Sequence, residues 1–66
     1  MYANLENAIR RRGIKKKAIA AQLGITPRGF SKKLAGESHF KWEEVQTIQS
    51  RFFPDKSYDY LFKKTA

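Results

Sequence analysis

The stretch KKAIAAQLGITPRGFSKKLAG, residues 16–36, decides the fold predicted for this chain. In its first part Ile19, Ala20 and Leu23 follow the spacing of a helix with one narrow apolar face. Gly24 predicts the end of that helix, because glycine adopts the left-handed backbone of a helix stop without steric cost. The pattern therefore predicts a short helix that ends at Leu23.

A second helix, 26–35, is predicted after a very short turn. Thr26 and Pro27 are typical of a helix start, since threonine caps the first turn and proline costs nothing at the first helical position. Phe30 and Leu34, four residues apart, form its buried face, and a glycine ends it. Two short helices joined by a glycine-containing turn predict a helix-turn-helix, whose second helix can enter the major groove of DNA.

The run AIAAQLGITPRGFSKKLAG resembles the helix-turn-helix of the phage Cro and repressor family, also called the XRE-like family. The matching residues are Ala20, the turn Leu23-Gly24-Ile25, Phe30 and Gly36. The later segment FKWEEVQTIQSRFFPDKSYDYLF is similar to small Cro-like regulators of Gram-positive phages and prophages. The resemblance implies a lambda-repressor-like DNA-binding fold. It also implies a repressor that binds an operator and controls the choice between lytic and lysogenic growth.

The charge is concentrated in the half of the chain that contains the predicted helix-turn-helix. The whole sequence has a net charge of +8. Residues 1–33 hold nine cations and one acid, whereas residues 34–66 hold five cations and five acids. Such a one-sided excess of positive charge indicates a surface that binds a polyanion, and double-stranded DNA is the expected partner.

Three lysines stand where the first of the two helices begins: Lys15, Lys16 and Lys17. A helix start normally prefers a small polar cap and acids, so each cation there costs on the order of a few tenths of a kcal/mol. A phosphate held at that end makes the lysines stabilising rather than costly, because backbone N–H groups and lysines then both face an anion. We expect all three to contact phosphates; the simpler alternative is a solvated run of charge.

The outward residues of the second helix are the candidates for reading bases. Arg28 is the first choice, since its guanidinium group can donate two hydrogen bonds to one guanine, at O6 and at N7. Lys32 lies one turn later on the same face, and Ser31 can bond either a base or a phosphate. We therefore predict base contacts from Arg28, Ser31 and Lys32.

Three further residues are predicted to contact phosphates: Thr26, Lys33 and Ser38. Thr26 is engaged as the cap, and Lys33 lies beside the buried edge of the helix. Gly29 costs roughly 1 kcal/mol relative to alanine within a helix. It either lets the backbone approach DNA closely or relieves a clash with the preceding helix.

Three more helices are predicted outside the central stretch, over residues 2–12, 42–51 and 58–62. The first has Leu5, Ala8 and Ile9 on its apolar face, and ends in the triplet 10–12 of arginines. That triplet either suits the negative end of the helix dipole or contacts phosphates. In the fourth helix Trp42, Val45, Ile48 and Phe52 follow helical spacing, which favours core packing over stacking on bases. Ser57 is expected to cap the last helix.

The aromatic C-terminal region has two expected roles. Leu61 is expected to face the core, while the neighbouring rings either complete the core or form the seam of a dimer. The candidates for that seam are Phe52, Phe53, Tyr58, Tyr60 and Phe62.

The predicted fold is all-α, a compact bundle of about five short helices in a single domain, residues 1–66. A chain this small gains little stability from one core, so a homodimer is expected, at least on DNA. There is no cysteine and no apolar run of the roughly 18 residues that a membrane span needs. We expect a cytoplasmic protein that works on the DNA of a bacterial host.

No enzymatic site is predicted. The single histidine, His39, has no second ligand at metal-binding spacing, and no nucleophile, paired acids or glycine-rich phosphate loop is present. No metal, cofactor or small-molecule ligand is therefore expected. Besides a sequence-specific regulator, two alternatives remain: a non-specific, architectural nucleic-acid binder, and a protein-interaction module that uses the C-terminal aromatic helix.

Overall fold

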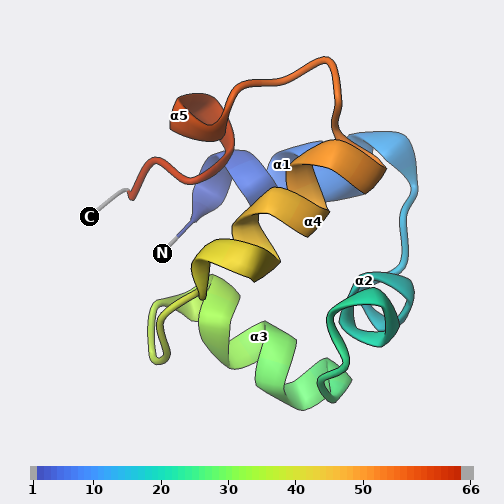
Figure 1. Ribbon diagram of the computed structural model, residues 1–66, viewed down its shortest axis with the longest axis vertical. Helices are drawn as coiled ribbons and strands as arrows, with labels where there is room; N and C mark the ends of the chain where they lie inside the picture. The colour runs from blue at the N-terminus through green and yellow to red at the C-terminus, as the bar shows by residue number, and fades with distance from the viewer. Residues whose placement is uncertain (1, 65–66) are drawn as a thin grey trace.

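A computed structural model describes residues 2–64, and all of the regular structure within them is helical (Figure 1). The five helices are α1 (Ala3–Arg12), α2 (Lys16–Leu23), α3 (Pro27–Ala35), α4 (Trp42–Phe52) and α5 (Tyr58–Leu61). The predicted all-α class is therefore confirmed, and every predicted helix end lies within one residue of the observed one. No helix in this part of the chain is long and apolar enough to cross a membrane.

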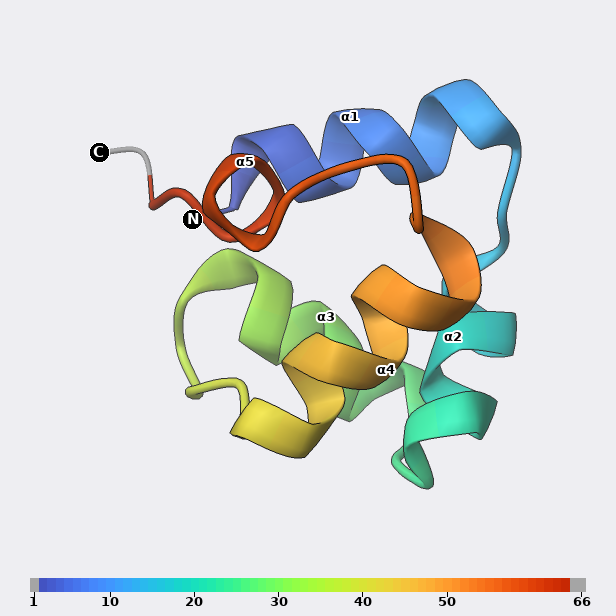
Figure 2. The same cartoon turned by 45° about the horizontal axis from the view of Figure 1, so that its top comes forward.

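The helices enclose one core (Figures 1 and 2). Helix α2 contacts α3 and α4, while α5 contacts α1 and α4. The apolar faces predicted for α1, α2 and α3 are buried except for Leu23, which is half-buried against the core, and Leu61 of α5 faces inward as expected. The buried apolar residues are Tyr2, Leu5, Ala8, Ile9, Ile19, Ala20, Phe30, Leu34, Ile48, Phe53 and Leu61.

Four aromatic rings join distant parts of the chain. The ring of Phe40 lies edge-on to those of Tyr2, Phe62 and Phe30, with centroid distances of 5.2, 5.3 and 6.1 Å. The backbone N–H of Tyr2 also donates to the carbonyl of Leu34 at 3.1 Å. These contacts hold the start of α1, the end of α3 and the C-terminal segment together, because edge-to-face pairs add to the burial of each ring.

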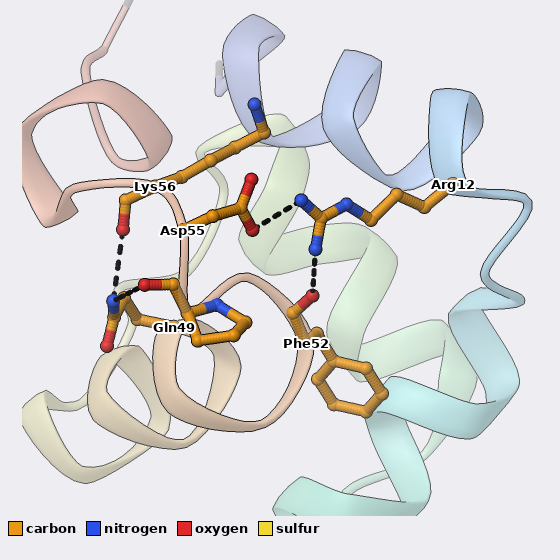
Figure 3. Close-up of polar contacts among 6 residues, drawn as sticks. Arg12, Gln49, Phe52, Asp55 and Lys56 are labelled. Carbon is orange, nitrogen blue, oxygen red and sulfur yellow. Dashed lines mark hydrogen bonds and ion pairs between the residues drawn. The ribbon is translucent and has the colours of Figure 1, made fainter.

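Arg12 ties the end of α1 to the end of α4 (Figure 3). Its Nη1 donates to the carbonyl oxygen of Phe52 at 2.7 Å, its Nη2 pairs with Asp55, and its guanidinium lies over the ring of Phe53. The hydrogen bond from Arg12 holds the pKa of Asp55 below its ordinary value. For this member of the arginine triplet, the structure therefore favours a structural role over contact with phosphate.

The loop after α4 is held by a side chain of that helix. The amide Nε2 of Gln49 donates to the carbonyl oxygens of Pro54 and Lys56, at 3.5 and 3.0 Å (Figure 3). The chain then enters α5, where the hydroxyl of Ser57 accepts from the N–H of Tyr60 at 3.1 Å. The predicted cap of the last helix is thus confirmed.

The prediction that Trp42 packs in the core is wrong, because 59% of the residue is exposed. The residue begins α4, and six positions separate it from the buried Ile48. At 3.6 residues per turn that separation rotates Trp42 about 120° away from the direction of Ile48. The inward place one turn before Ile48 is taken by Glu44 instead.

Three of the five predicted dimer-seam residues belong to the core of the monomer. Phe53 is fully buried, so it is not available to a partner. Phe52 and Phe62 are half-buried and pack against the core. Only Tyr58 and Tyr60 have exposed rings, because the short α5 directs Leu61 inward and leaves its two tyrosines outside.

Candidate nucleic-acid interface

Helices α2 and α3 are joined by three residues and pack against each other. Gly24 has φ +70°, the left-handed conformation predicted for it, and its N–H donates to the carbonyl of Ala21 at 3.2 Å. Ile25 is half-buried against the core. The hydroxyl of Thr26 then accepts from the N–H of Gly29 at 3.0 Å, which confirms the predicted cap of α3. The glycine stop after α2 and the threonine cap before α3 thus define the turn between the two helices.

The three predicted base-reading residues share one exposed face of α3. Arg28, Ser31 and Lys32 are all exposed, whereas Phe30 and Leu34 are buried on the other side of the helix. Residues three and four positions apart are neighbours on a helix, so the guanidinium, hydroxyl and ammonium groups form one contiguous stripe. Burial of the opposite side leaves this stripe as the solvent-exposed side of α3.

The start of α2 carries the three lysines without any acid in the first turn. Lys15 is the N-cap residue and makes no side-chain capping bond, and Lys15, Lys16 and Lys17 are all exposed. Lys16 lies 3.4 Å from the carboxylate of Glu6, and such a partly exposed pair contributes little stability. Between residues 15 and 35 there are six cations and no acid.

The space around Gly29 decides against one of the two explanations for a glycine at this position. A Cβ added there meets the cap hydroxyl of Thr26 at 3.2 Å and no atom of α2 within 4 Å. Relief of a clash with α2 is therefore the wrong explanation, because the nearest neighbour belongs to the cap of the same helix. Close approach of this backbone to DNA stays a prediction. Thr26 and Ser38, predicted to contact phosphates, are both exposed.

Lys33 is not a free phosphate contact as predicted, because its ammonium group is engaged inside the domain. It lies 2.9 Å from Oε1 of Glu44 and 3.0 Å from the carbonyl oxygen of His39, and only 13% of its side chain is exposed. The same carboxylate accepts from the backbone N–H of Lys41 at 2.8 Å. One largely buried ion pair thus joins the end of α3 to the start of α4.

Glu44 lies in the first turn of α4, and sequence reasoning did not identify its role. A glutamate three residues after an N-cap has capping-box spacing, which signals its bond to the Lys41 N–H. No local pattern signals the pair with Lys33, because eleven positions separate the two residues and only the packing of α3 on α4 brings them together.

The pair makes stability depend on pH. Burial alone raises the pKa of Glu44, but the Lys41 N–H and the Lys33 ammonium outweigh burial and lower the pKa below the ordinary 4.5. Because the pKa of Glu44 is lower in the native state than in the unfolded state, the stabilisation is complete above the unfolded pKa. It is lost as the pH falls through the native pKa.

We therefore expect Glu44→Gln to lower the free energy of unfolding at pH 7 by about 1.5–3 kcal/mol, the range for a hydrogen bond to a charged group. Urea unfolding at pH 7 and at pH 3 measures this effect. The difference between wild type and variant should shrink at pH 3. Glu43→Gln is the matched control, since Glu43 is exposed in the same turn of α4 and has no ion-pair partner within residues 2–64. An equal difference at both pH values contradicts the assignment.

Comparison with known proteins gives no match: no protein-family model, curated protein or solved structure matches this chain. The function proposed below is therefore inferred from the residues and their geometry.

Proposed function

We propose that this chain is a sequence-specific double-stranded DNA-binding regulator, a Cro-like repressor of a phage or prophage. In this proposal α2 and α3 form the helix-turn-helix of a lambda-repressor-like fold, and α3 lies in the major groove. The observation that carries it is the exposed stripe of Arg28, Ser31 and Lys32 on a helix whose other side is buried. A positively charged helix face without acids has the chemistry that base edges and phosphates require.

Base recognition is assigned to the stripe on α3. Arg28 has no ion-pair partner within residues 2–64, so its guanidinium group is free to donate to O6 and N7 of a guanine. Lys32 reaches an acceptor about one turn further along the groove, and Ser31 bonds a base or a phosphate between them. These contacts supply specificity.

Phosphate binding is assigned to the start of α2. The N–H groups of Lys16 and Lys17 have no backbone partner within residues 2–64. Together with the ammonium groups of Lys15, Lys16 and Lys17, they present donors and positive charge to an anion at the positive end of the helix dipole. A phosphate there fixes the position of α3 in the neighbouring groove. It also offsets the cost of three cations at a helix start.

A regulator of this size is expected to act as two copies on a two-fold operator, with half-sites about one helical turn apart. Occupancy of the operator then excludes other proteins from an overlapping promoter, and no further chemistry is needed for repression.

The experiment that tests this function is a selection from random duplex DNA with the purified protein, at about physiological salt. A two-fold symmetric motif supports a dimeric operator-binding regulator and identifies the bases assigned to Arg28 and Lys32. Retention of DNA without any motif favours the architectural binder. Absence of retention turns attention to the aromatic residues of α4 and α5 as a protein-binding surface.

Lys16→Ala is expected to weaken binding to all DNA sequences by a similar factor. The logarithmic dependence of affinity on salt should fall by about one, because one fewer phosphate counterion is displaced. Titration of labelled duplexes at several salt concentrations measures both quantities. Lys63→Ala, which removes an exposed lysine beyond α5, is the control. An unchanged salt slope for Lys16→Ala excludes a phosphate at the start of α2.

A further inference from the structure

A single carboxylate lies against the lysines that are assigned to phosphate binding. Glu6 is the one acid within the first 36 residues of the sequence, and all other charged side chains there are cations. The ammonium group of Lys16, at the start of α2, donates to Oε1 of Glu6, in the first turn of α1, at 3.4 Å. The helix dipole favours an acid in the first turn of α1, but it does not account for contact with a lysine of another helix.

The pair between Lys16 and Glu6 differs in kind from the pair between Lys33 and Glu44. The Lys33 pair spans 2.9 Å, and its side chains are only 13% and 9% exposed, so it belongs to the packing of the domain. The side chains of Lys16 and Glu6 are 45% and 27% exposed, and their separation is longer than the roughly 2.7–2.9 Å of a strong charged hydrogen bond. The carboxylate therefore holds Lys16 weakly, and another anion can replace it.

We propose that Glu6 is an internal competitor for the DNA phosphate assigned to Lys16, and that it lowers the affinity of this surface for DNA of any sequence. In the free protein the carboxylate occupies the Lys16 ammonium group. On DNA a phosphate oxygen takes its place. This inference rests on the proposed function, because it concerns the strength of the same phosphate contact.

Both arrangements that Lys16 can adopt on DNA are unfavourable because of Glu6. If the ammonium group leaves the carboxylate for the phosphate, the ion pair inside the protein is lost. If it donates to both anions at once, which its three N–H groups allow, the carboxylate and the phosphate lie close together and repel each other. Either way, an uncharged side chain at position 6 removes a cost of binding.

The opposite effect of Glu6, to hold Lys16 in the right place for DNA, is smaller. Such positioning helps binding only if the pair orders the lysine side chain strongly before DNA arrives. The exposed, 3.4 Å contact with Glu6 orders it weakly, because exposed ion pairs gain little over their solvated state. Competition therefore outweighs positioning.

The competitor acts on the part of binding that does not depend on sequence. Contacts with phosphates supply non-specific affinity, and Lys16 is assigned to a phosphate. Arg28 and Lys32, assigned to bases, have no ion-pair partner within residues 2–64. Glu6 thus weakens the sequence-independent attraction and leaves the base contacts unopposed.

Glu6→Gln is expected to raise the affinity for every duplex by about two- to fivefold, the range that corresponds to one exposed ion pair. The gain should shrink as salt is raised, because screening weakens both the ion pair and the repulsion. Titration of labelled duplexes of several sequences, at several salt concentrations, measures both effects. Circular dichroism confirms that the variant is folded.

Asp59→Asn is the matched control, because it removes the same charge from an exposed residue of α5 without an ion-pair partner in the described part of the chain. Helices α5 and α2 lie on opposite sides of the molecule in both views, at the left and the right (Figures 1 and 2). Asp59→Asn therefore measures the effect of overall charge alone. In a Lys16→Ala background, the gain from Glu6→Gln should fall to that of Asp59→Asn, because the competition acts through the Lys16 ammonium group.

Three results overturn the proposal. Equal affinities for Glu6→Gln and Asp59→Asn mean that Glu6 contributes only its charge. Weaker binding by Glu6→Gln than by the wild type means that Glu6 positions Lys16 for DNA. A gain that persists in full in the Lys16→Ala background means that Glu6 does not act through Lys16.

Elution from phosphocellulose, a matrix of immobilised phosphate groups, separates this inference from the proposed function. Glu6→Gln should elute at a higher salt concentration than Asp59→Asn, although the two variants have the same formal charge. If the wild type binds no duplex DNA but this difference is present, the proposed function fails and competition at Lys16 stands. If the two variants elute together, the inference fails whether or not the protein binds DNA.

Discussion

Phe30→Ala is expected to leave the domain largely unfolded at room temperature. Phe30 is fully buried in α3, and its ring lies edge-on to that of Phe40 at 6.1 Å. Truncation of a buried phenylalanine to alanine costs about 3–5 kcal/mol, because both the burial and the filled volume are lost. A domain below 70–80 residues rarely has more than about 3–5 kcal/mol of stability from its core.

Urea unfolding followed by far-ultraviolet circular dichroism measures the effect of Phe30→Ala. Phe30→Leu should lose less stability, because it retains most of the apolar volume. Ser31→Ala, at the exposed neighbouring position, should change the free energy of unfolding by less than about 0.5 kcal/mol. A loss below about 1 kcal/mol for Phe30→Ala contradicts the core described for α3.

Arg28→Ala is expected to produce the largest loss of DNA affinity from a single substitution. Removal of a bidentate contact to guanine costs about 1–3 kcal/mol and relaxes the preference at one base pair. That cost corresponds to a loss of affinity of about 5- to 150-fold. Stability should change little, because Arg28 is exposed and has no ion-pair partner within residues 2–64.

Affinities for the selected duplex and for duplexes with each base pair changed measure the effect of Arg28→Ala. Arg51→Ala is the matched control, since it removes the same charge from an exposed position on α4. Its effect should be small and uniform across sequences. If Arg28→Ala also weakens all sequences equally, Arg28 contacts a phosphate and base recognition belongs to Lys32 and Ser31.

The helices themselves were predictable because their signals are local. Left-handed glycine stops, the Thr26 and Ser57 caps, and apolar residues at helical spacing each act within about one turn, so a single sequence reveals them. The outward stripe of α3 was predictable for the same reason. Once Phe30 and Leu34 are assigned inward, helical geometry directs Arg28, Ser31 and Lys32 outward.

The roles of several cations and aromatic rings depended on partners distant in the sequence. Lys33 and Arg12 look like free surface charges, but Lys33 pairs with Glu44 and Arg12 donates to the carbonyl of Phe52. Phe53 is buried under the Arg12 guanidinium, and Phe62 joins the cluster around Phe40. No pattern along the chain separates these rings from the exposed tyrosines.

The sequence by itself determined the five helices, the buried faces of α1 to α3 and the concentration of positive charge in the first half of the chain. Those features follow from conformational preferences and charges carried by neighbouring residues. Only the tertiary structure decided that Trp42 is exposed, that Lys33 is paired and that Phe53 is unavailable to a partner. The physical reason is that burial and ion pairing depend on which helices meet, and the spacing of residues within one helix does not specify its neighbours.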